Sequence, residues 1–220
     1  MTPRVGIVTG FSAEAALLAG RSWRVAMAGG RPERAAALAE AMVTEGAQML
    51  VSFGIAGGLD SDLSPGAVVV ADGVWTDRTG PIPCAEEAAS LAAALPRARR
   101  GLIAAVPDVV ADRAAKQNLA ERSGALAVDL ESGMVARAAQ AAGLPFLALR
   151  AVADPAHRTL PPAALIGLDK WGRVRLGPVL VSVALNPFQV PGLIRVGLDT
   201  KRALAALKDA VPALENVVAR

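Results

Sequence analysis

Aromatic side chains, cysteine and histidine are all scarce in this sequence. Aromatic residues make up 3% of the 220 residues, and tyrosine is absent. Proteins that bind nucleic acids stack bases on aromatic rings, so we expect no nucleic-acid partner. The single cysteine, Cys84, excludes an intrachain disulfide, and with the single histidine, His157, it provides too few ligands for a His/Cys metal site. We expect no metal and no cofactor, and a packed or partly exposed thiol at Cys84. We expect His157 on a surface loop, with an occasional substrate contact as the alternative.

Long apolar runs are missing as well. The longest nearly apolar stretches, such as Pro178 to Leu185, are too short to span a bilayer, and the N-terminus offers no apolar core of a signal peptide. The net charge is +3, from 23 basic and 20 acidic residues spread along the chain. These features predict a cytoplasmic protein with at most peripheral membrane contact.

Small and branched apolar residues are abundant. Hydrophobic residues make up 53% of the chain, which excludes disorder, and the length suits one domain spanning residues 1–220. Short apolar runs predict strands at Arg4–Val8, Trp23–Ala28, Met49–Phe53, Val68–Ala71, Val74–Thr76, Leu102–Val106, Ala127–Asp129 and Phe146–Val152. Helical spacing predicts helices at Ala13–Ala19, Pro32–Met42, Glu86–Leu95, Ala111–Arg122, Ser132–Ala142, Leu176–Ala184 and Val190–Leu207. Gly80, Pro81 and Pro83 predict a turn-rich loop at residues 77–83.

Two acids lie where predicted strands end. Glu131 follows the strand Ala127–Asp129, and Asp154 follows the strand Phe146–Val152. Ligand sites in open α/β sheets lie beyond the carboxyl ends of strands, so both acids are candidates for an active site. Their spacing fits structural roles equally well, as a helix N-terminal acid for Glu131 and a turn residue for Asp154.

Two glycine-containing turns follow predicted strands. The first, Thr9–Ser12, opens a helix and invites comparison with dinucleotide-binding folds, but the further glycines that such a turn needs are absent. A nicotinamide-dependent reductase would also need a tyrosine. The second, Gly54–Leu59, reads as a loop whose small residues let backbone N–H groups face a ligand.

Four segments together resemble the purine nucleoside phosphorylase and nucleosidase superfamily. They are G-I-V-T-G-F-S-A-E-A-A-L-L from Gly6, G-I-A-G-G-L from Gly54, V-D-L-E-S from Val128 and L-R-A-V-A-D from Leu149. The resemblance implies a three-layer α/β/α domain with a mixed, largely parallel central sheet. It also implies cleavage of the N-glycosidic bond of a small-molecule nucleoside by a homo-oligomer.

The C-terminal third resembles one branch of this superfamily. The run D-P-A-H-R-T-L-P-P-A-A-L-I-G-L-D from Asp154, G-R-V-R-L-G-P-V-L from Gly172 and the triplet Asn186-Pro187-Phe188 look like the branch associated with hopanoid biosynthesis. Its members are understood to remove adenine from adenosylhopane, a lipid-linked nucleoside. The resemblance therefore implies an adenine nucleoside with an apolar 5′ substituent, and phosphate as an alternative to water.

The resemblance also implies catalytic roles. Asp154 corresponds to the general acid that protonates the leaving purine near N7, and Glu14 to the base that takes a proton from water. Glu131 corresponds to the residue that accepts hydrogen bonds from the ribose hydroxyls. Arg150 would orient the water or hold a phosphate.

The implied pocket residues are smaller and less polar. Leu130 would pack under the ribose, and the backbone of Ala56 and Gly57 would lie against the purine and ribose. Val110 and Ala111 would line the base pocket.

Two positions depart from the family pattern and leave questions open. Ile55 and Ala153 stand where many members have hydroxyl residues, so we expect a more apolar pocket. Glu14 argues for hydrolysis because a carboxylate repels phosphate, whereas four arginines could supply anion donors: Arg31, Arg34, Arg150 and Arg158. The alternatives to an adenosylhopane-like substrate are a methylthioadenosine-like one, or a purine sensor without turnover.

Overall fold

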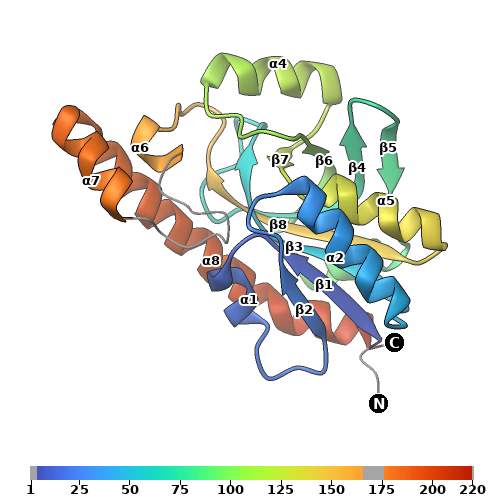
Figure 1. The fold of residues 1–220 in the computed structure, drawn as a ribbon. Helices are drawn as coiled ribbons and strands as arrows, with labels where there is room; N and C mark the ends of the chain where they lie inside the picture. The colour runs from blue at the N-terminus through green and yellow to red at the C-terminus, as the bar shows by residue number, and fades with distance from the viewer. Residues whose placement is uncertain (1–3, 166–175, 220) are drawn as a thin grey trace.

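The computed structural model describes residues 4–165 and 176–219, and its centre is a mixed sheet of eight strands with helices on both faces (Figure 1). The strands are β1 (Val5–Thr9), β2 (Arg24–Met27), β3 (Met49–Gly58), β4 (Val68–Thr76), β5 (Gly80–Pro83), β6 (Arg99–Ala105), β7 (Ala127–Asp129) and β8 (Phe146–Asp154). The helices are α1 (Ser12–Leu17), α2 (Pro32–Thr44), α3 (Glu87–Ala94), α4 (Arg113–Ser123), α5 (Ser132–Ala142), α6 (Pro162–Leu165), α7 (Leu176–Leu185) and α8 (Val190–Val218), with a 3₁₀ turn, η1 (Pro187–Gln189), between the last two.

Most neighbouring strands are parallel. β1 pairs in parallel with β2 and β3, β3 with β8, and β6 with β4 and β7. The antiparallel pairs are β3 with β7, β4 with β5 and β4 with β8. Strands β3, β8, β4, β6 and β7 therefore form a closed ring of pairings, from which β1 and β2 extend at β3. The predicted mixed, largely parallel sheet is confirmed.

Two apolar clusters hold the helices against the two faces of the sheet. On one face, α2 and α5 contribute Ala35, Met42, Val135 and Ala139 to the core. On the other, α3 and α8 contribute Leu91, Leu207, Val211 and Leu214. This gives the α/β/α layering that the sequence predicted.

The predicted strand–helix–strand unit around Glu131 is confirmed. β7 and α5 have the predicted bounds, Ala127–Asp129 and Ser132–Ala142, and β8 extends two residues beyond its predicted end to Asp154. Gly143 ends α5 in the left-handed conformation, with φ of 65°.

The segment predicted as the loop Gly54–Leu59 is instead, as far as Gly58, the second half of β3. Gly57 and Gly58 pair with Val128 and Ala127 of β7, and Gly57 also pairs with Asp154 of β8. A Cβ atom at Gly57 would lie 3.1 Å from Cγ1 of Val128, so the small residues serve close strand contact.

The segment predicted as a turn-rich loop, residues 77–83, also contains a strand. Gly80 to Pro83 form β5, which pairs with β4 as a hairpin at the edge of the sheet. Proline is tolerated on such an edge because the missing N–H faces away from the partner strand.

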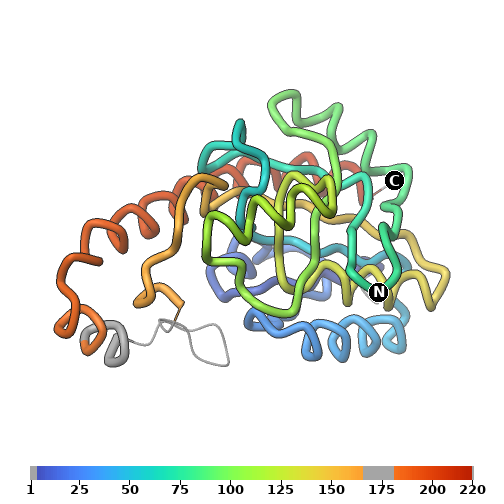
Figure 2. Tube along the Cα trace, turned by 90° about the horizontal axis from the view of Figure 1, so that it is seen from above, coloured from blue at the N-terminus to red at the C-terminus, as the bar shows by residue number. Residues whose placement is uncertain are grey.

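Helix α8 continues past its predicted end at Leu207, through Pro212, to Val218. A proline inside a helix costs roughly 3 kcal/mol, but the burial of Ala210, Val211 and Leu214 in the core offsets that cost. At its other end α8 extends away from the body together with α6 and α7 (Figure 2). Residues 166–175, which carry part of the branch-like tail sequence, lie outside the described residues.

Candidate active site

Glu14 lies in the first turn of α1, and its carboxylate is held entirely by backbone donors. It accepts hydrogen bonds from the N–H groups of Gly10 at 2.7 Å, Phe11 at 2.8 Å and Ile55 at 2.8 Å. Burial raises the pKa of Glu14, although these N–H groups and the charge of Arg150 act in the opposite direction. The β1–α1 turn and β3 thus fix the position of this carboxyl group.

Glu131 lies beside Glu14 at the start of α5. A Cβ atom at Gly10 would lie 3.0 Å from Oε1 of Glu131 and 3.3 Å from Oε2 of Glu14, so both carboxyl groups approach the same backbone position. Burial, and next the charge of Asp129, raise the pKa of Glu131 to about 8. The predicted sugar-binding acid and the predicted base are therefore brought together.

Arg150 is buried in the middle of β8 and is already paired. Its guanidinium forms an ion pair with Asp129, through Nε at 2.7 Å and through Nη2, and donates to Ser52 at 2.7 Å. Burial alone would lower the pKa of Arg150, but the surrounding carboxylates, Asp129 first and Glu131 next, raise it. The sequence analysis did not identify Asp129. The signal was available, because a buried arginine on a strand needs a buried acid and V-D-L-E-S contains one.

Asp154 lies at the end of β8 and has a partner that the sequence analysis also missed. The ammonium group of Lys116, on α4, contacts Oδ2 of Asp154 and donates to the carbonyls of Pro155 at 3.1 Å and Arg158 at 2.9 Å. Burial raises the pKa of Asp154, while Lys116 lowers it. Burial thus favours the protonated form of Asp154, whereas the fully buried ammonium group of Lys116 favours the ionised form.

The three predicted acids lie along β3 in two groups. Glu14 contacts Gly54 and Ile55 and lies beside Glu131 at Gly10, whereas Asp154 pairs with Gly57, and its Oδ2 lies 3.9 Å from a Cβ position there. The charged neighbours of Asp154 are Lys116, Arg158 and Asp199, whereas Glu14 and Glu131 both interact with Arg150.

Several buried polar atoms in this region have no hydrogen-bond partner among the described residues. They are Thr9 Oγ1, Glu131 Oε1, Arg150 Nη1 and Asp154 Oδ1. Arg137 Nε on α5 is a fifth such atom. Unpaired buried polar atoms are uncommon in folded proteins, and this set combines two carboxyl oxygens, two donor nitrogens and a hydroxyl. The arrangement can bind a ligand that carries several hydrogen-bonding groups.

The remaining predicted contact residues are more dispersed. Leu130 is partly buried, with Cδ1 3.5 Å from a Cβ position at Gly30, and Ala56 is buried in β3. Val110 packs on the apolar cluster below α4, and the carbonyl of Ala111 accepts a hydrogen bond from Leu160 at 2.9 Å. Ala111 thus lies beside the loop that follows Asp154.

The two residues that depart from the family pattern do not lie on the side expected for them. The side chains of Ile55 and Ala153 pack into the core cluster beneath α8. Apolar side chains at these two positions therefore contribute to the packing of this core cluster.

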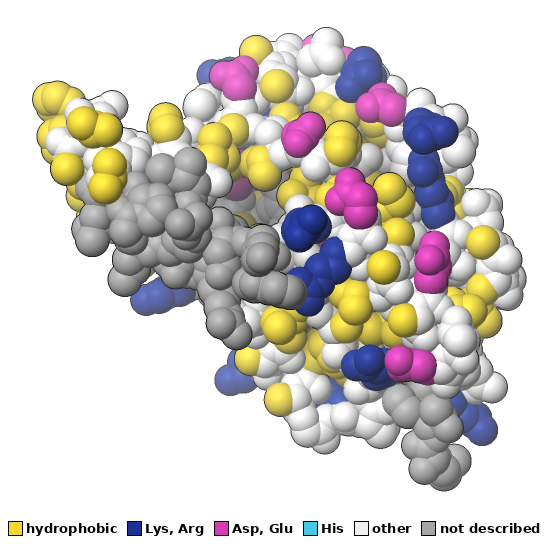
Figure 3. Space-filling model, viewed as in Figure 1, with side chains coloured by type: hydrophobic (Ala, Val, Ile, Leu, Met, Phe, Trp, Pro, Cys, Tyr) yellow, Lys and Arg dark blue, Asp and Glu magenta, His cyan; other side chains and the backbone are white. Residues whose placement is uncertain are grey.

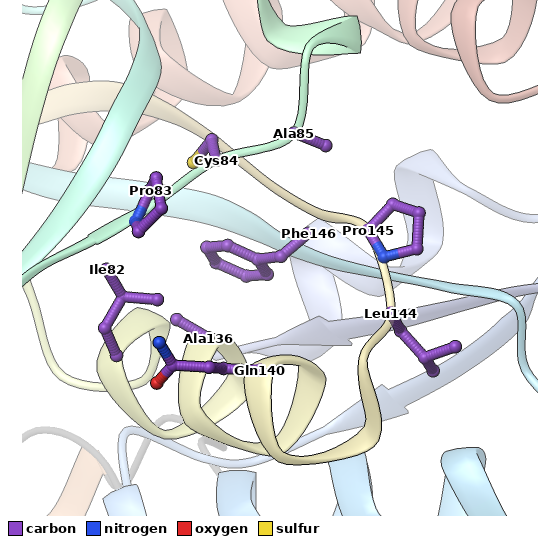
Figure 4. Close-up of a pocket in the computed structure, with 9 residues that line it drawn as sticks. All are labelled: Ile82, Pro83, Cys84, Ala85, Ala136, Gln140, Leu144, Pro145 and Phe146. Atoms are coloured by element: carbon purple, nitrogen blue, oxygen red, sulfur yellow. The ribbon is translucent and has the colours of Figure 1, made fainter.

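Two cavities lie elsewhere on the molecule. One, of about 210 Å³, is lined by Ile82, Cys84 and Phe146 among others, near the start of β8 (Figure 4). Burial raises the pKa of Cys84 to about 12, so its thiol stays protonated, as expected of a packed residue. The other, of about 260 Å³, lies between α4 and the end of β3 and includes His157. None of the three acids lines either cavity.

The described part of the chain contains neither a metal-binding cluster nor a membrane-spanning helix. No group of three or more His, Cys, Asp or Glu side chains there could hold a metal ion. None of the described helices is long and apolar enough to cross a membrane.

Comparison with known proteins places this architecture in a family. Residues 4–169 match the model of the phosphorylase superfamily, and the chain belongs to that superfamily. The superfamily predicted from the sequence is thereby confirmed. A comparison with curated proteins finds no match.

Solved structures show the same fold at low sequence identity. The chain is similar to 5′-methylthioadenosine/S-adenosylhomocysteine nucleosidase from Neisseria meningitidis in complex with methylthio-immucillin-A, with a TM-score of 0.72 and 16% identity, over 97% of this chain and 98% of that chain. It is also similar to S-adenosylhomocysteine nucleosidase from Streptococcus pyogenes, with a TM-score of 0.67 and 19% identity over 96% and 97%. Futalosine hydrolase from Helicobacter pylori matches with a TM-score of 0.68 and 16% identity over 96% and 98%.

Proposed function

We propose that this protein hydrolyses the N-glycosidic bond of an adenine nucleoside that carries an apolar 5′ substituent. The observation that carries the proposal is the gathering of Glu14, Glu131 and Asp129 around the single guanidinium of Arg150. Glu131 and Arg150 in this cluster, and Asp154 in the second group, each carry a buried polar atom without a hydrogen-bond partner among the described residues.

The cluster suits the charge of the transition state. When the bond between C1′ and the purine breaks, the sugar becomes positively charged, and the departing base takes the bonding electron pair. Three carboxyl groups share the one guanidinium of Arg150. The carboxyl groups that Arg150 does not neutralise would be stabilised in their ionised form by a positively charged sugar. Preorganised groups of this kind stabilise the transition state more than the neutral substrate.

Asp154 is the proposed proton donor. Contact with Lys116 engages Oδ2 and leaves the buried Oδ1 without a partner. The proton of Asp154 would pass to N7 of the purine as the C1′–N9 bond breaks. The oxygen of a water molecule would bond to C1′, and the proton lost from that water would pass to Glu14. Each such step typically contributes about 10²–10⁴-fold to the rate.

Water is a better nucleophile for this site than phosphate. A phosphate dianion would have to approach the carboxyl groups of Glu14 and Glu131. Of the predicted anion donors, Arg150 is paired with Asp129, and Arg158 is paired with Asp199. Hydrolysis is therefore favoured over phosphorolysis.

The choice of an adenine nucleoside with an apolar 5′ group rests on two arguments. The sequence after Asp154 resembles the branch that acts on adenosylhopane. The Neisseria relative has methylthio-immucillin-A bound, an analogue with a short apolar methylthio group. A methylthioadenosine-like substrate is the alternative that this relative favours.

Release of free adenine from purified full-length protein tests the proposal. We expect release of adenine from 5′-alkyl-5′-deoxyadenosines and from 5′-methylthioadenosine. The rates should not depend on added phosphate, and the second product should be the free sugar. Inosine and uridine should be poor substrates. Binding of these nucleosides without any adenine release would identify a sensor, and formation of a sugar 1-phosphate would identify a phosphorylase.

One variant, assayed on two substrates, tests the role of Asp154 as the proton donor. Asp154→Asn should lower kcat for an adenine nucleoside by about 10²–10⁴-fold. Cleavage of p-nitrophenyl β-D-riboside should be much less affected, because nitrophenolate leaves without protonation. Equal losses on both substrates would contradict the assignment of Asp154.

A further inference from the structure

We propose that the hairpin of α7, η1 and the first turns of α8, residues 181–198, docks on the surface of an anionic lipid bilayer. We refer to these residues as the apolar arm. The apolar arm contains none of the residues that surround Arg150. Docking on a bilayer therefore does not depend on the proposed reaction.

Exposed apolar side chains gather on the apolar arm. Among the described residues nine large hydrophobic side chains are exposed, and six of them lie on it: Val181, Leu185, Phe188, Val190, Ile194 and Leu198. Leu185 is 82% exposed and Phe188 is 92% exposed. Figure 3 shows hydrophobic side chains crowded at the end of the molecule that carries the hairpin. Exposed patches of this kind mark protein or membrane contacts.

The spacing of these residues gives each helix one apolar face. Val181 and Leu185 are four residues apart on α7, and Val190, Ile194 and Leu198 follow the same spacing on α8. The turn between the helices therefore joins two apolar stripes at the part of the arm farthest from the body (Figure 1).

The turn is held in place rather than frayed. The buried side chain of Gln189 donates to the carbonyl of Ser182 at 2.8 Å and accepts from the N–H of Ala163 at 3.0 Å. Gln189 thereby ties η1 to both α7 and α6. Leu185 and Phe188 remain exposed beside a fixed polar anchor.

The charges on and beside the apolar arm indicate which kind of partner would bind to it. No charged residue occurs from Gly177 to Ile194, and the first one, Arg195, is exposed and basic. The next acid, Asp199, is buried in ion pairs with Arg158 and Arg202. An exposed apolar surface bordered by the cationic side chain of Arg195 complements anionic lipid headgroups. If a second copy docked through the same face, the Arg195 side chains of both copies would lie at the interface. Repulsion between these like charges disfavours a dimer through this face.

The apolar arm is connected to the candidate active site. Asp199 on α8 pairs with Arg158, whose carbonyl accepts a hydrogen bond from Lys116, the partner of Asp154. A docked arm would therefore hold the loop after Asp154 near the bilayer, where a nucleoside with a long apolar 5′ substituent partitions. This last step rests on the proposed function, whereas membrane docking does not.

Co-sedimentation of the full-length protein with phosphatidylcholine vesicles, with and without phosphatidylglycerol, tests the proposal. We expect binding to the vesicles that contain phosphatidylglycerol, weakening as salt is added. Leu185→Ser/Phe188→Ser should weaken binding by about tenfold or more, whereas Val109→Ser, which alters an exposed apolar residue of the body, should not. Arg195→Glu should weaken binding more than Arg97→Glu, which makes the same charge change elsewhere.

Three outcomes would overturn the proposal. The first is the absence of binding to either vesicle, and the second is an equal loss of binding in the arm and control variants. The third is a dimer in solution that Leu185→Ser/Phe188→Ser converts to a monomer, which would assign this face to contact between copies. Adenine release from soluble 5′-deoxyadenosine should be the same for the arm variant and the wild type. Failure of docking is therefore distinguishable from failure of the proposed reaction.

Discussion

At the scale of single residues, the protonation of Glu131 links the acid cluster to the stability of the fold. The carboxyl groups of Asp129, Glu131 and Glu14 surround the guanidinium of Arg150. Of these, Asp129 forms the ion pair with Arg150. Glu131 is buried beside them, so its neutral form is favoured. The folded protein thus holds a proton that an unfolded chain would release at neutral pH.

This protonation predicts a pH dependence of stability. The pKa of Glu131 is about 8 in the fold against 4.5 for the ordinary side chain. Its stabilising contribution is complete below 4.5, declines as the pH rises, and is lost above about 8. Over that window the wild type should lose on the order of a few kcal/mol of unfolding free energy more than Glu131→Gln. Urea unfolding at a series of pH values measures this, and parallel profiles for the two proteins would contradict it.

Lys116 provides a second prediction at this scale. It lowers the pKa of Asp154, so Lys116→Met should raise that pKa further. Because Asp154 must be protonated to act as an acid, the alkaline limb of the kcat profile should move to higher pH. Loss of one member of a buried pair should also cost about 3–5 kcal/mol of stability.

The control for Lys116 is an exposed lysine of the same charge. Lys201→Met should change neither the alkaline limb nor the stability by a comparable amount. A profile for Lys116→Met that keeps its wild-type limb while activity falls would show that Lys116 supports only the structure.

At the scale of elements, the sequence predicted those helices and strands whose bounds depend on residues close by in the chain. The bounds of β7 and α5 follow from apolar spacing and from Gly143, which are readable in the sequence. The strand character of Gly54–Gly58 and of Gly80–Pro83 depends on partners far along the chain. Periodicity does not reveal such partners, so both segments were predicted as loops.

The same distinction explains the site. Acids at strand ends could be located because each ends its own apolar run. Lys116 and Asp154 are 38 residues apart, and Ser52 and Arg150 are 98 apart, so these partners emerge only when the chain folds. Asp129 was the exception, since it lies two residues before Glu131 in the same short motif.

The contact between β3 and α1 supplies a prediction for these elements. A Cβ atom at Gly54 would lie 2.6 Å from Oε1 of Glu14, so Gly54→Ala should displace the carboxylate from the N–H of Ile55. We expect a loss of about 1–3 kcal/mol in unfolding free energy and a lower kcat.

Gly197→Ala is the matched control for Gly54→Ala. Nothing lies within 4 Å of a Cβ atom at Gly197, and it lies inside α8. This substitution should stabilise the protein by about 0.5–1 kcal/mol because alanine favours the helix. Wild-type stability and activity in Gly54→Ala would show that Glu14 does not depend on this close contact.

At the scale of the whole molecule, distant parts of the chain build one acid-rich site in a protein of net charge +3. Glu14 comes from α1, Glu131 from the start of α5 and Arg150 from β8, so a ligand that joins them should stabilise the entire fold. The acid excess makes the sign of the ligand's charge decisive. Binding of a cation should also lower the pKa of Glu131 and release a proton.

An adenine nucleoside analogue with a protonated nitrogen in the sugar ring tests this coupling. At about 100 times its dissociation constant it should stabilise the fold by about 2.7 kcal/mol, which for a protein of this size raises the melting temperature by roughly 5–10 °C. The neutral carbocyclic analogue at the same concentration should raise it less, and in Glu131→Gln the difference between the two should shrink. Calorimetry in buffers of different ionisation enthalpy should register proton release near neutral pH with the cationic analogue alone. Equal stabilisation by both analogues would mean that the acid cluster holds the fold together without serving a cationic sugar.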